Sequence, residues 1–151
     1  MPTPEVSPGA SRERFAMTRP AARRLRGMDM RNEIGEVVAE RQLEAVAADG
    51  SRTPVTVRFG RPRPDELSEH GDWCCPYQIL GLGEEGEETV RVAFGVDSLQ
   101  ALLLSVYRAR LELEERARTA PVRLDWLGLP GLGLTVDPDQ LRGADPGPMA
   151  V

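Results

Sequence analysis

The sequence predicts an α+β fold in which an antiparallel β-meander of about four strands is covered on one face by a single long α-helix, with a short strand following the helix. Residues 98–117 contain the one sustained helical period. Short stretches of alternating apolar residues precede it, as in 55–59 and 89–94, and are separated by Gly, Pro and acidic residues. This order of elements is typical of a meander followed by a covering helix.

The helix is expected to begin at Ser98. Asp97 can act as its N-cap, and Gln100 can complete a capping box. The apolar residues at three- and four-residue steps are expected to be buried: Leu99, Leu102, Leu103, Val106, Ala109, Leu113 and Ala117. The solvent-facing side is expected to hold Ala101, Ser105, Arg108, Glu112, Glu115 and Arg116. Arg110 interrupts the apolar stripe and is expected to snorkel to water.

The 33–48 stretch fits a helix or an alternating strand. The Asp49-Gly50 pair and the strand pattern at 55–59 favour a hairpin, so we interpret it as a strand. Arg41 would then face the core, as Arg110 does from the helix.

Further strands are expected at 73–82, 89–94 and 122–127. In the 89–94 strand the inward residues should be Val90, Val92 and Phe94, continued by Val96. The 60–72 stretch is expected to be a long loop without ladder pairing, because it is rich in Pro and turn residues.

The 151 residues carry a formal charge of −5 and are 40% hydrophobic, which suits one modest core. Residues 1–32 hold seven Arg against three acids and are expected to be a disordered basic arm. A single domain is expected over 33–136 and a disordered tail over 137–151. The folded part is acidic, which makes a nucleic-acid partner unlikely.

Cys74 and Cys75 are adjacent, and neighbours on a strand point to opposite faces, so they are not expected to form a disulfide. We expect one of them to pack under the helix and the other to be half exposed. Without an expected disulfide, transmembrane segment or secretory signal, the cytoplasm is the expected location.

The sequence shows no catalytic set. One His and two adjacent Cys match no usual zinc spacing, so neither a metal nor another cofactor is expected. Catalysis by a thiol would require His70 as its base, and simple burial of the cysteines is favoured. The Gly-rich stretches at 81–83 and 128–133 do not lie between a strand and a helix start, so we interpret them as turns.

Two sets of residues are candidates for binding. Arginines aimed at one pocket could hold an anion or nucleotide, and this alternative function would use Arg41, Arg110, Tyr77, Gln78 and Glu114. The leading hypothesis is a non-enzymatic domain that binds another protein through apolar residues on edges and loops. Those residues are Trp73, Leu80, Leu82, Trp126 and Leu129.

Three motifs carry a resemblance to a known family. They are WCCPYQI at 73–79, GVDSLQAL at 95–102 and LDWLG at 124–128. With them, residues 33–133 resemble an uncharacterised family of small bacterial domains of unknown function. The resemblance implies a compact α+β domain in a cytoplasmic bacterial setting and implies no activity. Size and class are also similar to those of toxin-neutralising immunity proteins, which is an analogy only.

Overall fold

The computed structural model describes residues 31–83 and 88–135. Their main elements are β1 (Val37–Val46), β2 (Arg52–Gly60), β3 (Arg63–Pro64), β4 (Trp73–Leu80), β5 (Arg91–Gly95), α2 (Ser98–Thr119), β6 (Arg123–Asp125) and a short 3₁₀ turn (Pro130–Gly133). Most of the predicted basic arm and all of the predicted 137–151 tail lie outside the described residues.

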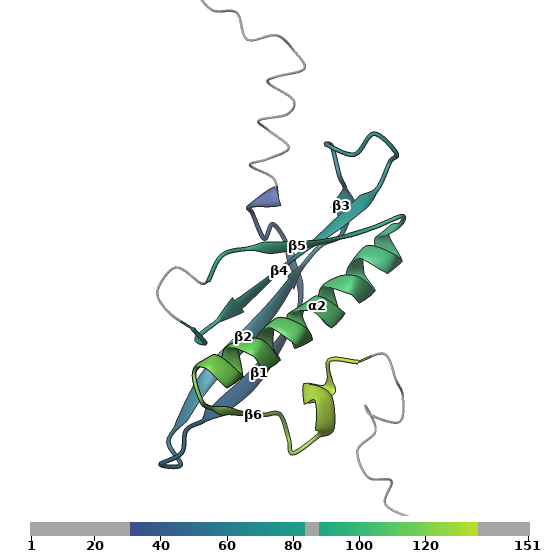
Figure 1. The fold of residues 1–151 in the computed structure, drawn as a ribbon. Coiled ribbons are helices and arrows are strands. Elements are labelled where there is room, and N and C mark those ends of the chain that lie inside the picture. Colours follow the sequence, from purple (N-terminus) through teal and green to yellow (C-terminus); the bar gives the residue numbers. More distant parts are fainter. Residues whose placement is uncertain (1–30, 84–87, 136–151) are drawn as a thin grey trace, which may run out of the picture.

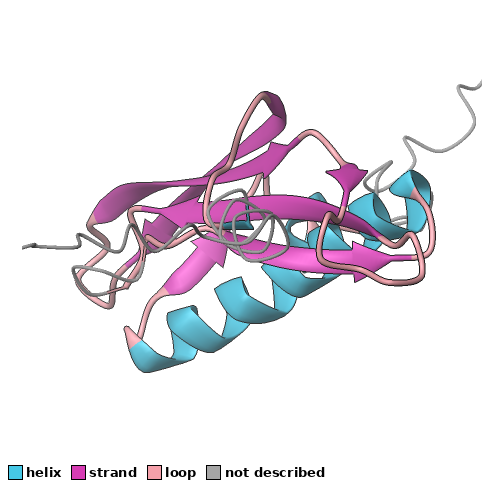
Figure 2. Cartoon of the chain, turned by 90° about the horizontal axis from the view of Figure 1, so that it is seen from above, coloured by secondary structure: helices cyan, strands magenta, loops and turns pink. Residues whose placement is uncertain are grey.

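The strands form one antiparallel sheet in which β4, β2, β1 and β6 are neighbours in that order and β5 pairs with β4. Helix α2 lies diagonally across one face of this sheet (Figure 1). Seen from above, helix and sheet make two layers (Figure 2). The α+β prediction, with one long helix and a short strand after it, is confirmed.

The β1–β2 hairpin confirms that residues 37–46 are a strand rather than a helix. Its turn is closed by a 2.9 Å hydrogen bond from Gly50 N to Ala47 O, and Asp49 accepts one from Ser51 N at 2.8 Å. Gly50 has a φ of +84°, a conformation that glycine adopts without strain. The turn therefore sets the register that places Leu43 opposite Val55.

The start of α2 is as predicted. Asp97 accepts a 2.8 Å hydrogen bond from Gln100 N, while Gln100 Oε1 accepts one from Val96 N, also at 2.8 Å. The first bond satisfies an amide that the first helical turn leaves without a partner, and the second ties the Gln100 side chain to the backbone just before the N-cap.

The predicted buried face of α2 is right in part, because Ala109, Leu113 and Ala117 are buried as expected, but it is wrong at other positions. Ala101 and Ser105, both expected on the solvent-facing side, are 0% exposed, whereas Leu99, expected in the core, is 62% exposed. The complete buried set is Ala101, Ser105, Ala109, Leu113, Arg116 and Ala117. At the start of the helix the cause is close packing, since a Cβ at Gly95 would lie 2.4 Å from Ala101 N and the backbones leave no room for a large side chain there.

The predicted inward residues of the 89–94 strand are also corrected. Ala93 is fully buried in β5, whereas Phe94 and the following Val96 are exposed. The small side chain fits beneath α2, which packs on β5, and Phe94 instead meets Arg31, whose guanidinium lies 4.8 Å from the ring centroid.

The 60–72 stretch contains a short ladder that was not expected. Arg63 and Pro64 of β3 pair with Cys74 and Trp73 of β4. Pro can occupy such a position because an edge strand leaves one backbone N–H out of the ladder.

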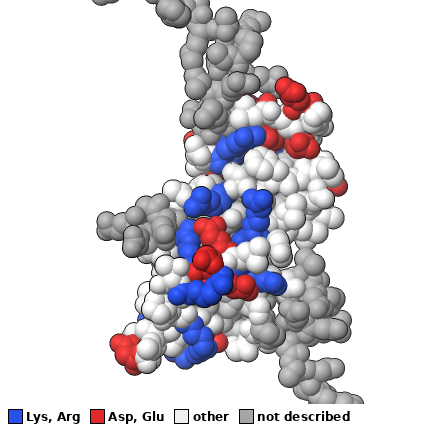
Figure 3. All heavy atoms as spheres, viewed as in Figure 1, with Lys and Arg blue, Asp and Glu red and all other residues white. Residues whose placement is uncertain are grey.

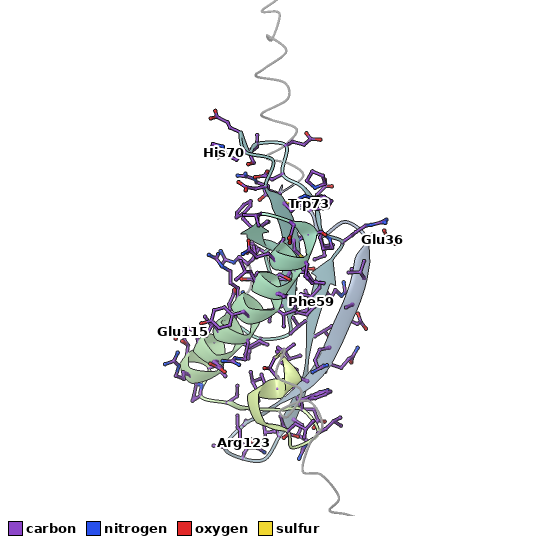
Figure 4. All side chains as sticks on the ribbon, turned by 90° about the vertical axis from the view of Figure 1, so that its right-hand side faces the viewer. Glu36, Phe59, His70, Trp73, Glu115 and Arg123 are labelled. Carbon is purple, nitrogen blue, oxygen red and sulfur yellow. The ribbon has the colours of Figure 1, made fainter. Side chains whose placement is uncertain are left out.

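The core lies between α2 and the sheet, where Phe59 is seen between the two layers (Figure 4). Its members are Leu43, Ala45, Val55, Val57, Phe59, Tyr77, Ile79, Leu82, Ala109, Leu113, Leu132 and Leu134. Leu132 and Leu134 come from the segment after β6, so this segment closes one side of the core.

Candidate functional site

The largest group of exposed apolar side chains on a single element lies on the side of α2 that faces away from the sheet. We call this the outer face of α2 and define it as Leu99, Leu103, Leu104, Tyr107 and Leu111, all of them exposed. Four of these recur at four-residue steps, so they form one continuous ridge along the helix. Tyr107 is 51% exposed in the middle of it.

The outer face follows directly from the way α2 packs. Over its first three turns the buried side uses the small residues Ala101, Ser105 and Ala109, and the large apolar residues between them turn to solvent. The first ten residues of α2, Ser98–Tyr107, include no charged residue. The N-terminal half of the helix is therefore apolar on both its buried and its exposed sides.

Charge is concentrated on the C-terminal half of α2. Figure 3 shows the contrast, with an uncharged surface over the N-terminal half of the helix and basic and acidic side chains over the C-terminal half. Most of these charges are paired, as in Arg116 with Glu112 at 2.6 Å and Arg118 with Glu115. Among the residues that the structure describes, Arg108 has no carboxylate within ion-pair distance.

Arg110 borders the outer face on the side opposite Arg108. Its Nε lies 3.5 Å from Oε1 of Glu114, and its guanidinium carbon is 5.9 Å from the Tyr107 ring centroid. Within the described part of the chain this Nε is buried without a hydrogen-bond partner. Two arginines therefore flank the apolar ridge, and neither uses its full donor capacity.

Arg41 lies on the helix-covered side of the sheet, as predicted, but it is engaged in a structural contact. Its guanidinium stacks 3.6 Å from the Trp126 ring centroid, and Nη1 donates a 2.9 Å hydrogen bond to Leu132 O. Burial lowers the pKa of Arg41. This contact fixes the segment after β6 against β1.

The remaining residues of the predicted anion site lie apart from Arg41. Tyr77 points toward α2 and donates a 2.9 Å hydrogen bond to Glu112 Oε2. Gln78, the next residue in β4, points to the opposite face and donates to Glu88 O at 2.8 Å. Tyr77 and Gln78 therefore do not converge on one pocket, and the role of the five residues in binding an anion stays a prediction.

The Tyr77–Glu112 contact is partly buried, with Tyr77 5% exposed and the Glu112 side chain 19% exposed. Burial, reinforced by the Glu112 carboxylate, strongly raises the pKa of Tyr77. Glu112 also lies 3.6 Å from Arg91 Nε, so one carboxylate joins β4, β5 and α2. We interpret this cluster as structural.

The residues predicted to contact a partner are mostly covered in the structure. Leu82 is a core residue at 6% exposure. Trp126 is partly buried beneath Arg41, and Trp73, Leu80 and Leu129 are also only partly exposed. The sequence signal that could have located the outer face was the four-residue spacing of Ala101, Ser105 and Ala109, which indicates close packing.

Both thiols are buried, which corrects the expectation that one is half exposed. Cys75 lies under α2 and its Sγ is 3.4 Å from Gly60 O, while Cys74 lies on the other face at 2% exposure. Burial raises the pKa of each thiol. The only His, His70, lies on the loop at one end of the sheet (Figure 4).

Two shallow hollows are present on the described surface. One, of about 490 Å³, lies between the C-terminal half of α2 and the last described residues, with Glu114, Arg118 and Leu132 in its wall. The other, of about 380 Å³, is polar and surrounds Asp65, which is paired with Arg31. The described residues contain no group of three or more His, Cys, Asp or Glu side chains that could hold a metal ion.

The described helices include none that is long and apolar enough to span a membrane. A family model described as a domain of unknown function, DUF6968, matches residues 39–136. The chain belongs to the DUF6968 family. This confirms the resemblance to a family of domains of unknown function, and the match covers nearly all of the sheet and the whole of α2. Nothing among the curated proteins or the solved structures matches this DUF6968 chain.

Proposed function

We propose that this DUF6968 domain binds another protein through the outer face of α2. The observation that carries the proposal is the packing of the first three turns of α2, where small residues are buried while Leu99, Leu103 and Tyr107 face solvent. Removing apolar surface from water stabilises a complex by about 25 cal/mol per Å² before the costs of association are subtracted. A contiguous exposed ridge of this kind is typical of a protein-binding surface.

The arginines beside the ridge favour a partner that carries carboxylates around an apolar surface. Arg108 and Arg110 lie on its two sides: Arg108 has no ion-pair partner among the described residues, and the Arg110 side chain is 28% exposed. A partner that presents an apolar surface bordered by carboxylates would pair with Arg108 and with the exposed part of Arg110. The mixed charges of the C-terminal half of α2 are already paired and would lie at the rim of such an interface.

A binding role fits these residues better than a catalytic role. The thiols of Cys74 and Cys75 are buried, with pKa values raised by that burial, which disfavours the thiolate needed for attack. Tyr77 and Glu112 hold each other in a contact with little access to solvent. None of these groups lines either of the two hollows.

Site-specific photocrosslinking in the native cell tests the proposal. A benzophenone side chain at Leu103 should capture one defined protein, whereas the same group at Thr56, on the uncovered face of the sheet, should not. Leu103 is exposed and Thr56 is partly exposed, and the two lie on opposite faces of the molecule, so a difference in capture identifies the face that binds.

Binding of the captured protein, once purified, is then measured with variants. Leu103→Asp should weaken it by about tenfold or more, as loss of an apolar anchor does. Arg108→Glu should also weaken it and slow association, while the control Arg58→Glu, on the opposite face, should leave the affinity unchanged. Equal affinity of Leu103→Asp and the parent protein would refute the proposal.

A further inference from the structure

We infer that residues 136–151 of this chain dock on the outer face of α2 and compete there with the partner. The inference rests on the proposed function in one respect, because it identifies a regulator of the same surface. It stands on three observations: where the described chain ends, how far the remaining residues reach, and which side chains they carry.

The described chain ends beside α2. Gly131 and Leu132 share the wall of the 490 Å³ hollow with Glu114, Ala117 and Arg118. The contact of Arg41 with Leu132 O holds this segment in place. The described chain therefore ends within a few residues of a contact with the C-terminal half of α2, which follows the outer face along the helix.

The length of the segment is sufficient to follow the ridge. Sixteen residues, 136–151, span about 50 Å when extended. The helix from Leu99 to Arg118 is about 29 Å long at 1.5 Å per residue. The segment can therefore reach every residue of the outer face with length to spare.

The chemistry of the segment matches the surface. Its apolar residues are Val136, Ala144, Leu141, Met149, Ala150 and Val151, and its charged residues are Asp137, Asp139, Arg142 and Asp145. Asp137 and Asp139 lie two and four residues after Thr135. At this chain length they can reach Arg108 and Arg110, which flank the outer face. A segment that combines six apolar residues with three Asp and one Arg also has the chemistry that the proposed partner needs.

Tethering makes even a weak contact effective. A segment joined to its own binding site has an effective concentration of about millimolar, so a free partner must displace it. The outer face is then covered in the free protein and becomes available when a partner with higher affinity arrives.

Paramagnetic broadening in the full chain tests the inference. A nitroxide attached at Ala150→Cys would be selective, because Cys74 and Cys75 are 2% and 0% exposed. The methyl signals of Leu99, Leu103, Leu104 and Leu111 should lose intensity, whereas those of Val38, exposed on β1, should keep it. The variant Asp137→Asn/Asp139→Asn should restore the leucine signals, and it should bind the partner more tightly than the parent chain does.

A mixing control identifies the occupant. Spin-labelled chain without isotope is mixed with isotope-labelled chain without the nitroxide, and the leucine signals should keep their intensity. Equal broadening in this mixture would mean that a second copy covers the ridge, and full intensity in the singly labelled chain would mean that nothing from 136–151 does. Either result overturns the inference but leaves the crosslinking result intact. If crosslinking captures no protein but the broadening is present, the proposed partner is refuted and the intramolecular contact of residues 136–151 is still supported.

Discussion

The guanidinium of Arg41 stacks on the ring of Trp126 at 3.6 Å and donates to Leu132 O at 2.9 Å. The three residues come from β1, from the position after β6 and from the 3₁₀ turn, so one side chain joins the first strand of the domain to its last described segment. Two core leucines, Leu132 and Leu134, lie in that segment. The contact therefore contributes to closing the core as well as to local order.

Replacing Arg41 should destabilise the domain. Arg41→Ala removes a cation–π contact and a hydrogen bond, and we expect a loss of about 2 kcal/mol in the free energy of unfolding. Arg41→Lys keeps the charge but not the planar stacking, so it should recover only part of this loss. Urea denaturation measures both. The control Arg52→Ala, at an exposed ion pair with Glu44, should change stability by less than about 0.5 kcal/mol, and an equal effect of the two alanine variants would contradict the role of Arg41.

Two glycines provide a matched pair in the segment after β6. Gly133 and Gly128 have φ values of +61° and +68°, so alanine is strained at both. At Gly133 the new Cβ would also lie 2.2 Å from Trp126 Cζ3, whereas at Gly128 it would meet no atom within 4 Å. Gly128→Ala should cost about 1 kcal/mol from backbone strain, and Gly133→Ala should cost clearly more. Thermal unfolding of the two variants tests this order, which similar melting temperatures would disprove.

The packing of α2 predicts unequal losses of stability at two positions that lie two residues apart, Ala101 and Leu103. Ala101→Leu forces a larger side chain against the β5–α2 junction and should destabilise by about 1–3 kcal/mol. Leu103→Ala, on the outer face, should cost about 1 kcal/mol or less because the leucine is 40% exposed. Chemical denaturation measures both losses in the free energy of unfolding. A larger loss for Leu103→Ala than for Ala101→Leu would support the buried face that the sequence predicted.

The stability of the domain should fall in alkaline solution. Burial raises the pKa of Cys74, Cys75 and Tyr77 in the folded state, so the unfolded chain releases these protons first. Because the unfolded state then binds fewer protons than the folded state, the free energy of unfolding decreases as pH rises above about 8.5, where an unperturbed thiol ionises. Denaturation under reducing conditions at pH 7.5, 9 and 10 should show this decrease. Cys75→Ala should make it shallower, and a stability that stays level over this range would be evidence against the burial of these groups.

The parts of the fold that the sequence predicted depend on local signals. Asp97 and Gln100 lie three residues apart and fix the helix start through their own hydrogen bonds. Asp49 and Gly50 likewise define the hairpin that makes 37–46 a strand. Such contacts require no knowledge of the rest of the chain.

The parts that were missed depend on contacts between distant segments. The face of α2 was assigned by the size of its apolar residues, but it is decided by the space that Gly95 and Ala93 leave between helix and sheet. Arg41 was correctly placed on the core side, yet its partners follow it by 85 and 91 residues and no pattern near it indicates them. The candidate surface was missed for the same reason, since an exposed leucine is recognised only when the buried side of its helix is known.

Because small side chains pack between α2 and the sheet, the residues that pack in the core and the large apolar residues that face solvent are different ones. Residues 101, 105 and 109 are buried against the sheet, and residues 99, 103 and 107 are exposed and do not take part in the core. Side chains along this ridge can therefore be replaced, one at a time, while the scaffold beneath keeps its shape.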